Sequence, residues 1–256
     1  MTRLAVLTFD EPEFEPSYAG TRNEGTSIFA WLFFTGRCRF ADLDPRIVRS
    51  RGPVAGLALL ALGFLYALRS RIAPCRTVFD VLRREGVKAT FFGVFNLLDD
   101  PERRDRYLPV FREIVDQGHE LGLHGYSHAP LTETDLERAL ALAREHLGAS
   151  LATYSSPFGE DRREALTLLE AHGFIGMRVW DRALLEVTSP VRRLPYDYRL
   201  EKVMRSEDPI VVVNLHSGDC YPRGFRRLRR AISTLKRRGY RFAMFRDACA
   251  GETVRL

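Results

Sequence analysis

The chain has 256 residues, of which 45% are hydrophobic and 28% are charged; this is a globular composition that excludes a disordered protein. The 39 Lys and Arg residues against 33 Asp and Glu residues leave a net charge of +6, which favours anionic partners such as phosphates, lipid headgroups or nucleic acid. The four cysteines are widely separated and form no C-x-x-C pair, which argues against a disulfide framework or a cysteine-bound metal and indicates reduced thiols.

Apolar runs alternate with segments of helical periodicity along the chain. The predicted strands are residues 4–9, 88–93, 120–124, 210–215 and 240–245, and the predicted helices are 77–85, 105–117, 132–147, 162–172 and 225–238. Such alternation predicts parallel strands with crossover helices, and polar residues gather at the carboxyl ends of the strands. We therefore expect an α/β fold, a distorted (β/α)7-type barrel.

Residues 27–71 interrupt this alternation with two apolar stretches, 28–34 and 54–68. The second stretch is shorter than the ~20 residues that span a bilayer, and arginines flank it on both sides. A hydrophobic helix of this kind can lie in the membrane interface or enter the membrane partway, with its arginines at the headgroup phosphates. The alternatives are a helical cap on the barrel and a dimer contact. We expect one barrel domain, 1–256, whose apolar insertion binds an anionic membrane surface through residues 54–71.

The apolar run before Asp10 is too short for the hydrophobic region of a signal peptide. Together with the reduced thiols, it leads us to expect a cytoplasmic protein, peripheral on the inner face of the cell membrane. The basic segment at 223–238 also carries an apolar stripe at helical spacing, so we interpret it as an outer barrel helix and expect no nucleic-acid partner.

Two adjacent carboxyl groups, Asp10 and Glu11, directly follow the first predicted strand. Their charges are costly to bury unless a metal or another cation compensates them. Glu13 and Glu15 lie close by, so a solvated acidic loop is the alternative interpretation.

Three histidines follow later strands. His124 and His128 are four residues apart, a spacing that brings two imidazoles to one side of a turn and, with one carboxylate, forms a site typical of catalytic zinc or non-haem iron. His216 ends another strand, where an imidazole at the barrel mouth can act as a general acid. The alternatives are a surface loop with two unrelated histidines and a structural role for His216.

Four segments together resemble the polysaccharide deacetylase family (carbohydrate esterase family 4): Thr8-Phe9-Asp10-Glu11, residues 81–92, residues 118–128 and Leu215-His216. The resemblance implies a distorted barrel and a divalent metal, usually zinc, that serves to remove an N-acyl group from an amino sugar. Cobalt, nickel, manganese and iron stay open as the metal. The implied activity is that of a metal-dependent N-deacetylase or deformylase.

The resemblance also implies roles for individual residues. The family's base matches Asp10, its metal ligands match Glu11, His124 and His128, and its acid matches His216. The family's Pro-Tyr-Gly turn matches Pro157-Phe158-Gly159, so that the main-chain N–H of Phe158 would bind the oxyanion.

Several positions depart from the family pattern. Glu11 replaces the usual Asp, so Glu13 or Glu15 is an alternative ligand. Ser155 stands where the family has an arginine that orients the base, and Arg22 is our candidate for that role. The candidate substrate-binding residues are Tyr126, Trp180 and Asp181, of which the last two match the family's later aspartate and tryptophan region.

The stretch at 20–25, together with Gly122-Leu123-His124, is similar to the branch that deformylates a lipid-linked aminoarabinose. We therefore expect an amino-sugar glycan or glycolipid as substrate, carried on a polyprenyl phosphate or otherwise borne by a membrane. One alternative is a deacetylase of a soluble or cell-wall polysaccharide. The other is a catalytically silent barrel that only binds glycan or lipid.

Overall fold

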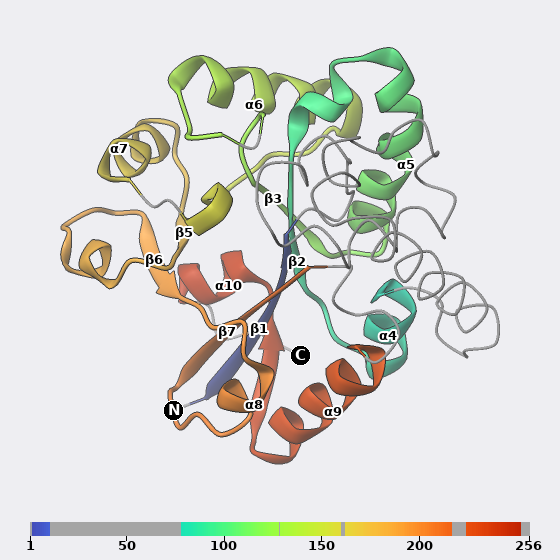
Figure 1. Cartoon of the computed structure of the whole chain (residues 1–256), viewed down its shortest axis with the longest axis vertical. Coiled ribbons are helices and arrows are strands. Elements are labelled where there is room, and N and C mark those ends of the chain that lie inside the picture. Colours follow the sequence, from blue (N-terminus) through green and yellow to red (C-terminus); the bar gives the residue numbers. More distant parts are fainter. Residues whose placement is uncertain (1, 11–77, 128, 160–161, 217–223, 252–256) are drawn as a thin grey trace, which may run out of the picture.

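The structure is a computed structural model that describes residues 2–10, 78–127, 129–159, 162–216 and 224–251. Figure 1 shows its parallel strands with helices around them. The strands are β1 (Arg3–Asp10), β2 (Thr90–Gly93), β3 (Glu120–Leu123), β4 (Thr153–Ser155), β5 (Gly176–Val179), β6 (Arg192–Pro195), β7 (Ile210–His216) and β8 (Tyr240–Ala243). The helices are α4 (Val78–Glu85), α5 (Pro101–Asp116), α6 (Glu133–Leu147), α7 (Arg163–Ala171), α8 (Leu200–Val203), α9 (Gly224–Arg237) and α10 (Phe245–Ala250), with short 3-10 turns η2 (Phe95–Leu98), η3 (Pro157–Gly159) and η4 (Arg182–Glu186).

The sheet runs in the order β6-β5-β4-β3-β2-β1-β7, and all its paired strands are parallel. The strand β8 pairs with the first half of β1, while β2 pairs with the second half. A single bridge between Asp197 and Val213 joins the segment after β6 to β7. These pairings confirm the predicted distorted (β/α) barrel.

The helix ends follow from local side-chain chemistry. Thr132 caps α6 by accepting a hydrogen bond from the N–H of Asp135, and Asp100 caps α5 in the same way. The helix α6 ends at Gly148, whose φ of 58° is the left-handed conformation that glycine adopts without strain.

The barrel core is strongly aromatic. Phe9 of β1 and Phe91 of β2 stack with their ring centroids 5.0 Å apart, and Phe92 meets Phe245 of α10 edge to face. Because parallel strands all end at the same edge, this core fixes the carboxyl ends of β1, β3, β4, β5 and β7 around one mouth.

The predicted strands and helices are largely present, but the short helices α8 and α10 and three strands were not predicted. The sequence patterns did not indicate β4, β5 or β6, which have only three or four residues each. The closing strand is also shorter than predicted, because α10 begins at Phe245. The insertion at 27–71 lies outside the described residues. Among the residues that are described, no helix is long and apolar enough to cross a membrane.

Candidate active site at the barrel mouth

Asp10 ends β1 and is buried, with its carboxylate bound by two side chains. Arg178 Nη2 donates to Asp10 Oδ2 at 2.5 Å, and Asn214 Nδ2 donates to the same oxygen at 3.0 Å. Both partners come from strand ends, Arg178 from β5 and Asn214 from β7. A carboxylate in this position has a compensating positive charge and hydrogen bonds, which is the condition for burying it ionised.

Arg178 is itself fully buried and binds four different side chains. Besides Asp10, it donates to Thr8 Oγ1 at 2.7 Å, Asn214 Oδ1 at 2.8 Å and Ser155 Oγ at 2.6 Å. Its guanidinium lies between two aromatic rings, 5.0 Å from the centroid of Phe92 and 4.5 Å from that of Tyr196.

His124 follows β3 and is also buried. Its Nδ1 lies 2.8 Å from the carbonyl oxygen of Ser155. Because a carbonyl only accepts, Nδ1 carries the proton, and in the neutral ring Nε2 holds the lone pair. Metal-binding histidines are typically oriented in this way, with one nitrogen donating to a backbone carbonyl and the other available as a ligand.

Ser155 therefore connects the two predicted functional groups. Its carbonyl orients His124, and its hydroxyl accepts a hydrogen bond from the arginine that holds Asp10. The structure thus brings Asp10 and His124, which are far apart in the sequence, into one connected polar network. Of the three predicted metal ligands the structure describes His124 alone, and its ring fits a divalent metal, because Nδ1 donates to the Ser155 carbonyl and the ligand tautomer is thereby fixed.

The other predicted catalytic and metal residues are described less fully. The backbone of His216 lies in register with Asp10 on the neighbouring strand. Glu11, Arg22 and His128 lie outside the described residues, as do the alternative ligands Glu13 and Glu15, and their roles stay predictions.

Phe158 lies in the turn η3, directly after β4. Its φ is 57°, which makes it the one non-glycine residue with positive φ in the described part of the chain. This left-handed conformation costs a residue with a side chain roughly 1 kcal/mol, and such strain gathers at functional sites. The Phe158 side chain is 44% exposed.

The predicted substrate-binding residues lie in two different environments. Trp180 and Asp181 follow β5 and are exposed; Asp181 caps η4 by accepting from the N–H of Ala183. The hydroxyl of Tyr126 donates to Asp99, an acceptor that raises the pKa of Tyr126. Tyr126 is partly buried against the core. Its hydroxyl therefore ties the loop after β3 to the end of η2.

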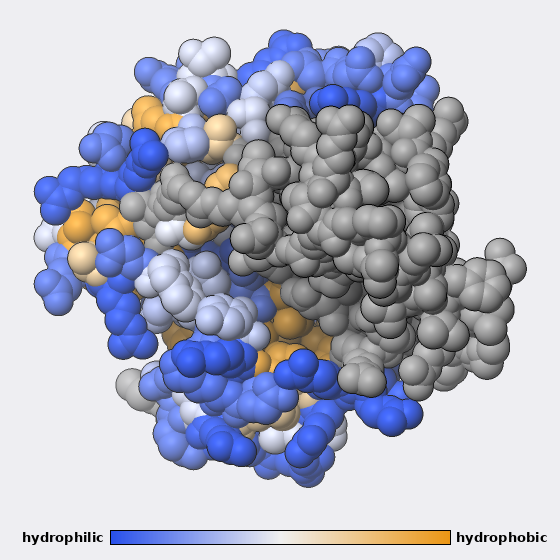
Figure 2. All heavy atoms as spheres, in the orientation of Figure 1, coloured by the Kyte–Doolittle hydropathy of each residue, from blue (hydrophilic) through white to orange (hydrophobic). Residues whose placement is uncertain are grey.

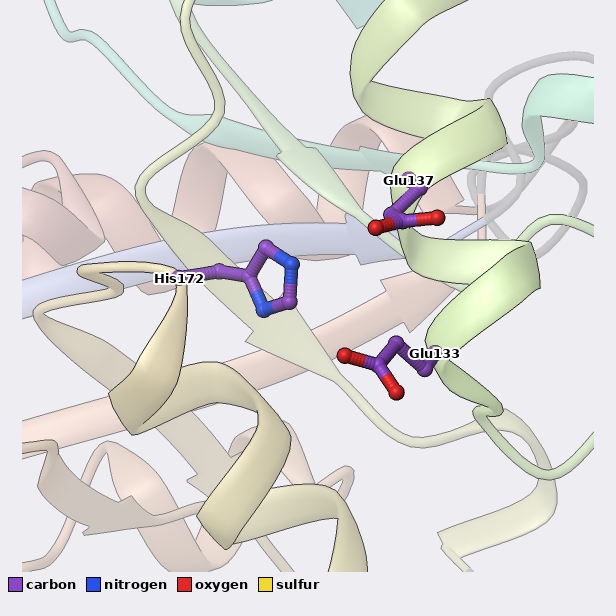
Figure 3. Close-up of side chains that lie close together, drawn as sticks. All are labelled: Glu133, Glu137 and His172. Atoms are coloured by element: carbon purple, nitrogen blue, oxygen red, sulfur yellow. The ribbon is translucent and has the colours of Figure 1, made fainter.

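A different group of potential metal ligands lies on the outside of the barrel. Figure 3 shows Glu133 and Glu137 projecting from α6 toward His172 at the end of α7. Among the described residues this is the one group of at least three such side chains whose ligand atoms lie within 4.8 Å of one another. The two glutamates are exposed, and the group contains none of the predicted ligands.

Arg178 and Asn214 are the site residues that the sequence patterns did not indicate. The available signal was an arginine inside the apolar stretch Gly176-Met177-Arg178-Val179, because a charged residue there is buried only with a partner. Asn214 carried a similar signal as the amide within the β-branched run that becomes β7.

Residues 73–176 match the family model described as polysaccharide deacetylase. Over this span, about two fifths of its length, the chain is similar to the polysaccharide deacetylase family. The matched span includes His124 and Ser155, whereas Asp10, Arg178 and Asn214 lie on either side of it. No curated protein matches the sequence at a significant level.

Solved structures of the same fold are similar to this chain at low sequence identity. The Xyl-CE4 domain of a multidomain xylanase from the hindgut metagenome of Trinervitermes trinervoides is 14% identical, with a TM-score of 0.52 over 100% of this chain and 93% of that chain. The polysaccharide deacetylase Bc1974 from Bacillus cereus is 13% identical, with a TM-score of 0.50 over 95% and 92%. BA3943, a CE4 family pseudoenzyme from Bacillus anthracis, is 15% identical, with a TM-score of 0.53 over 97% and 66%. These likenesses show the fold, and fold alone does not establish activity.

Proposed function

We propose that this chain is a metal-dependent hydrolase that removes an N-acyl group, acetyl or formyl, from an amino sugar of a glycan. The observation that supports this most directly is the network through Ser155, which joins a buried, ion-paired Asp10 to a His124 oriented as a metal ligand.

The metal would be held by Glu11, His124 and His128, with zinc as the first choice and cobalt, nickel, manganese or iron as the others. When bound, a divalent ion of this kind acidifies a coordinated water and provides positive charge for the developing oxyanion. Asp10, fixed by Arg178 and Asn214, accepts the proton of the attacking water. The main-chain N–H of Phe158 donates to the oxyanion, and His216 protonates the departing amine.

The glycan is proposed to be borne by a membrane, for example on a polyprenyl phosphate. Figure 2 shows a dense hydrophilic area over α8 and α9. Four exposed cations, Arg226, Arg227, Arg229 and Arg230, lie on the first turns of α9. A pocket at α8 is lined by three cations and two other polar residues: Arg199, Lys202, Arg205, Glu201 and Ser206. Ion pairs with Asp197, Glu201 and Glu85 neutralise part of this charge. Such a surface attracts anionic headgroups and complements the apolar, arginine-flanked stretch at 54–68. On this proposal the protein lies at the cytoplasmic face of the membrane.

The first experiment measures metal content by mass spectrometry in protein purified without chelators. We expect about one zinc-like ion per chain, lost in His124→Ala and in His128→Ala. The matched control is His172→Ala, which removes the histidine of the outer Glu133–Glu137 group and is expected to leave the metal in place. Loss of metal in the control but not in His124→Ala would contradict the proposed site.

The same protein, loaded with zinc, is then assayed for release of acetate or formate from N-acylated amino-sugar glycans. Release that is abolished in Asp10→Asn supports the hydrolase. A wild-type site that also refuses added metal, together with no release from any glycan, would favour the catalytically silent barrel.

A further inference from the structure

The loop after β3 is joined along its backbone to the turn η2. The N–H of Phe95 donates to the carbonyl of Gly125 at 3.3 Å, and the N–H of Asn96 donates to the carbonyl of Tyr126 at 2.8 Å. Gly125 has a φ of 87°, a conformation that a residue with a side chain rarely adopts. The backbone directly after His124 therefore has a defined path beside η2.

Three side chains form a second connection between this loop and its surroundings. The hydroxyl of Tyr126 donates to Asp99 Oδ2, and the guanidinium of Arg138 binds both oxygens of that carboxylate, through Nη2 to Oδ1 and through Nε to Oδ2 at 3.3 Å. A two-point contact between arginine and carboxylate fixes orientation as well as distance. We call Tyr126, Asp99 and Arg138 the loop anchor.

The loop anchor joins three elements that are separate in the sequence. Asp99 directly follows η2, and its N–H donates to the carbonyl of Asn96 at 3.2 Å. Arg138 belongs to α6, a helix that packs against η2. Tyr126 belongs to the loop after β3. The anchor therefore ties this loop both to η2 and to α6.

The charges of the loop anchor suit its hydrogen bonds. Arg138, with a smaller contribution from Tyr126, lowers the pKa of Asp99, and Asp99 in turn raises the pKa of Tyr126. At neutral pH the carboxylate is therefore an ionised acceptor and the phenol a neutral donor. The Arg138 side chain is 55% exposed, and an ion pair this exposed contributes little to stability. The anchor therefore fixes geometry more than it stabilises the fold.

The loop anchor acts on the segment that carries both predicted metal histidines. Tyr126 lies midway between His124 and His128 in the sequence. The ring of His124 is already oriented through Nδ1 by the carbonyl of Ser155, and the anchor holds the chain two residues further on. Ligands that are held in place before binding lose less conformational entropy when the ion binds. The anchor can therefore raise the metal affinity without touching the metal.

We propose that Asp99 and Arg138 are positioning residues for the metal site, because through Tyr126 they hold the loop that carries the metal histidines; this inference rests on the proposed function. Neither side chain is a predicted ligand or a predicted contact of the glycan. Outer partners that orient metal ligands change the metal affinity by about 10- to 100-fold. Since Asp99 acts through one further residue, we expect an effect near the lower end of this range, about tenfold.

The zinc affinity of the metal-depleted chain is measured by competition with a chromophoric chelator. Asp99→Ala and Tyr126→Phe should each raise the Kd for zinc about tenfold, and the double variant should bind as weakly as either single variant, because both break one hydrogen bond. Asp99→Asn keeps an acceptor for the Tyr126 hydroxyl and should restore most of the affinity lost in Asp99→Ala, which excludes a general folding defect. No glycan is present, so a contact of Tyr126 with substrate does not affect the result.

The matched control is Asp80→Ala. Asp80 forms a similar ion pair with Arg83 on α4, in which the two side chains are 23% and 64% exposed, against 26% and 55% for Asp99 and Arg138. This control should leave the Kd for zinc unchanged. Unchanged zinc affinity in Asp99→Ala, or an equal loss of affinity in Asp80→Ala, would overturn the loop anchor.

The same titration distinguishes failure of the loop anchor from failure of the proposed function. Zinc binding that is lost in His124→Ala but normal in Asp99→Ala would support the metal site and refute the anchor. A wild type that binds no zinc would refute both. Weaker zinc binding in Asp99→Ala, with no release of acetate or formate from any glycan by the zinc-loaded wild type, would support the anchor and refute the hydrolase.

Discussion

Arg178 on β5 reaches across the interior of the barrel to Asp10 on β1, 168 positions away in sequence. The two strands are not neighbours, since β4, β3 and β2 lie between them in the sheet. The pair therefore depends on the curvature of the barrel. Among the described residues, Arg178 is the one cation within 4 Å of the Asp10 carboxylate, and it lies inside the barrel mouth. In this chain the arginine that holds the proposed base comes from β5, and Ser155 accepts one of its hydrogen bonds.

Removing Arg178 is predicted to abolish efficient turnover. Arg178→Ala should lower kcat by about a hundredfold or more, because Asp10 loses its orientation, with a smaller effect on KM. It should also lower the free energy of unfolding by about 3–5 kcal/mol, because the buried carboxylate loses its counter-charge. Acetate release is the assay, and added guanidinium ion should restore part of the lost kcat.

The control for Arg178 is Arg193→Ala. Arg193, on β6, is only partly buried, and its guanidinium binds backbone carbonyls between residues 184 and 191. Its loss should reduce stability without a guanidinium-dependent recovery of kcat. Equal rescue of both variants, or undiminished kcat in Arg178→Ala, would contradict the positioning role.

Phe158 provides a second test, because its role is predicted for the main chain. Phe158→Gly keeps the N–H and relieves the positive φ, so the free energy of unfolding should rise by about 1 kcal/mol or remain unchanged. The kcat for an N-acetylglucosamine monomer should stay within about threefold of the wild type, since the oxyanion donor is retained. Phe158→Ala is the comparison, because it removes the ring and keeps the strained backbone. A large fall in kcat in both variants would show that the ring itself acts.

The sequence predicted the barrel and the two ends of the polar network, but not its centre. Asp10 and His124 could be identified because each is a polar residue directly after an apolar strand, a pattern that a few neighbouring residues are enough to show. The role of Arg178 could not be predicted in this way, since its partners come from β1, β4 and β7, and only the curled sheet brings them together. The strands β4 to β6 were missed for a related reason. A strand of three or four residues is too short to show a hydrophobic periodicity, and only its hydrogen bonds to neighbouring strands identify it.

Membrane binding is predicted to depend on the insertion. Deleting residues 54–68 should move the protein from sedimented anionic vesicles to the supernatant while leaving one metal ion per chain. The physical reason is that the deletion variant has no apolar segment to bury in the lipid. The exposed cations of α9 alone bind anionic headgroups only weakly and in a salt-dependent way. Arg226→Gln with Arg230→Gln is the companion variant, expected to weaken binding at low salt only. Retention of the deletion variant on vesicles at high salt would contradict the prediction.

His119 gives a prediction on stability that is independent of the active site. Its ring is buried against Phe79 and Phe91, and its Nδ1 accepts a hydrogen bond from the N–H of Ala89 at 3.3 Å. Burial, with a smaller contribution from the charge of Lys88, lowers the pKa of His119 to about 4. Protonation of His119 Nδ1 would also remove the acceptor for the Ala89 N–H and leave two N–H groups facing each other.

The pKa of His119 in the unfolded chain is near 6.5, so between about pH 6.5 and pH 4 the unfolded state binds a proton that the folded state does not. Stability therefore falls as the pH is lowered through this window, by about 2 kcal/mol between pH 7 and pH 5 from His119 alone. The neighbouring Glu120 acts in the opposite direction, since burial raises its pKa and the folded state then holds the extra proton. Comparing variants at one pH cancels the contribution of Glu120.

His119→Gln keeps an acceptor for the Ala89 N–H but does not titrate. Urea unfolding at pH 7 and pH 5 should show that its free energy of unfolding falls by about 2 kcal/mol less than that of the wild type over this interval. His172→Gln, which changes a less buried histidine at the end of α7, is the control for loss of an imidazole. If wild type and His119→Gln lost stability in parallel, the acid sensitivity would lie elsewhere, and the neutral, buried state of His119 at pH 5 would be refuted.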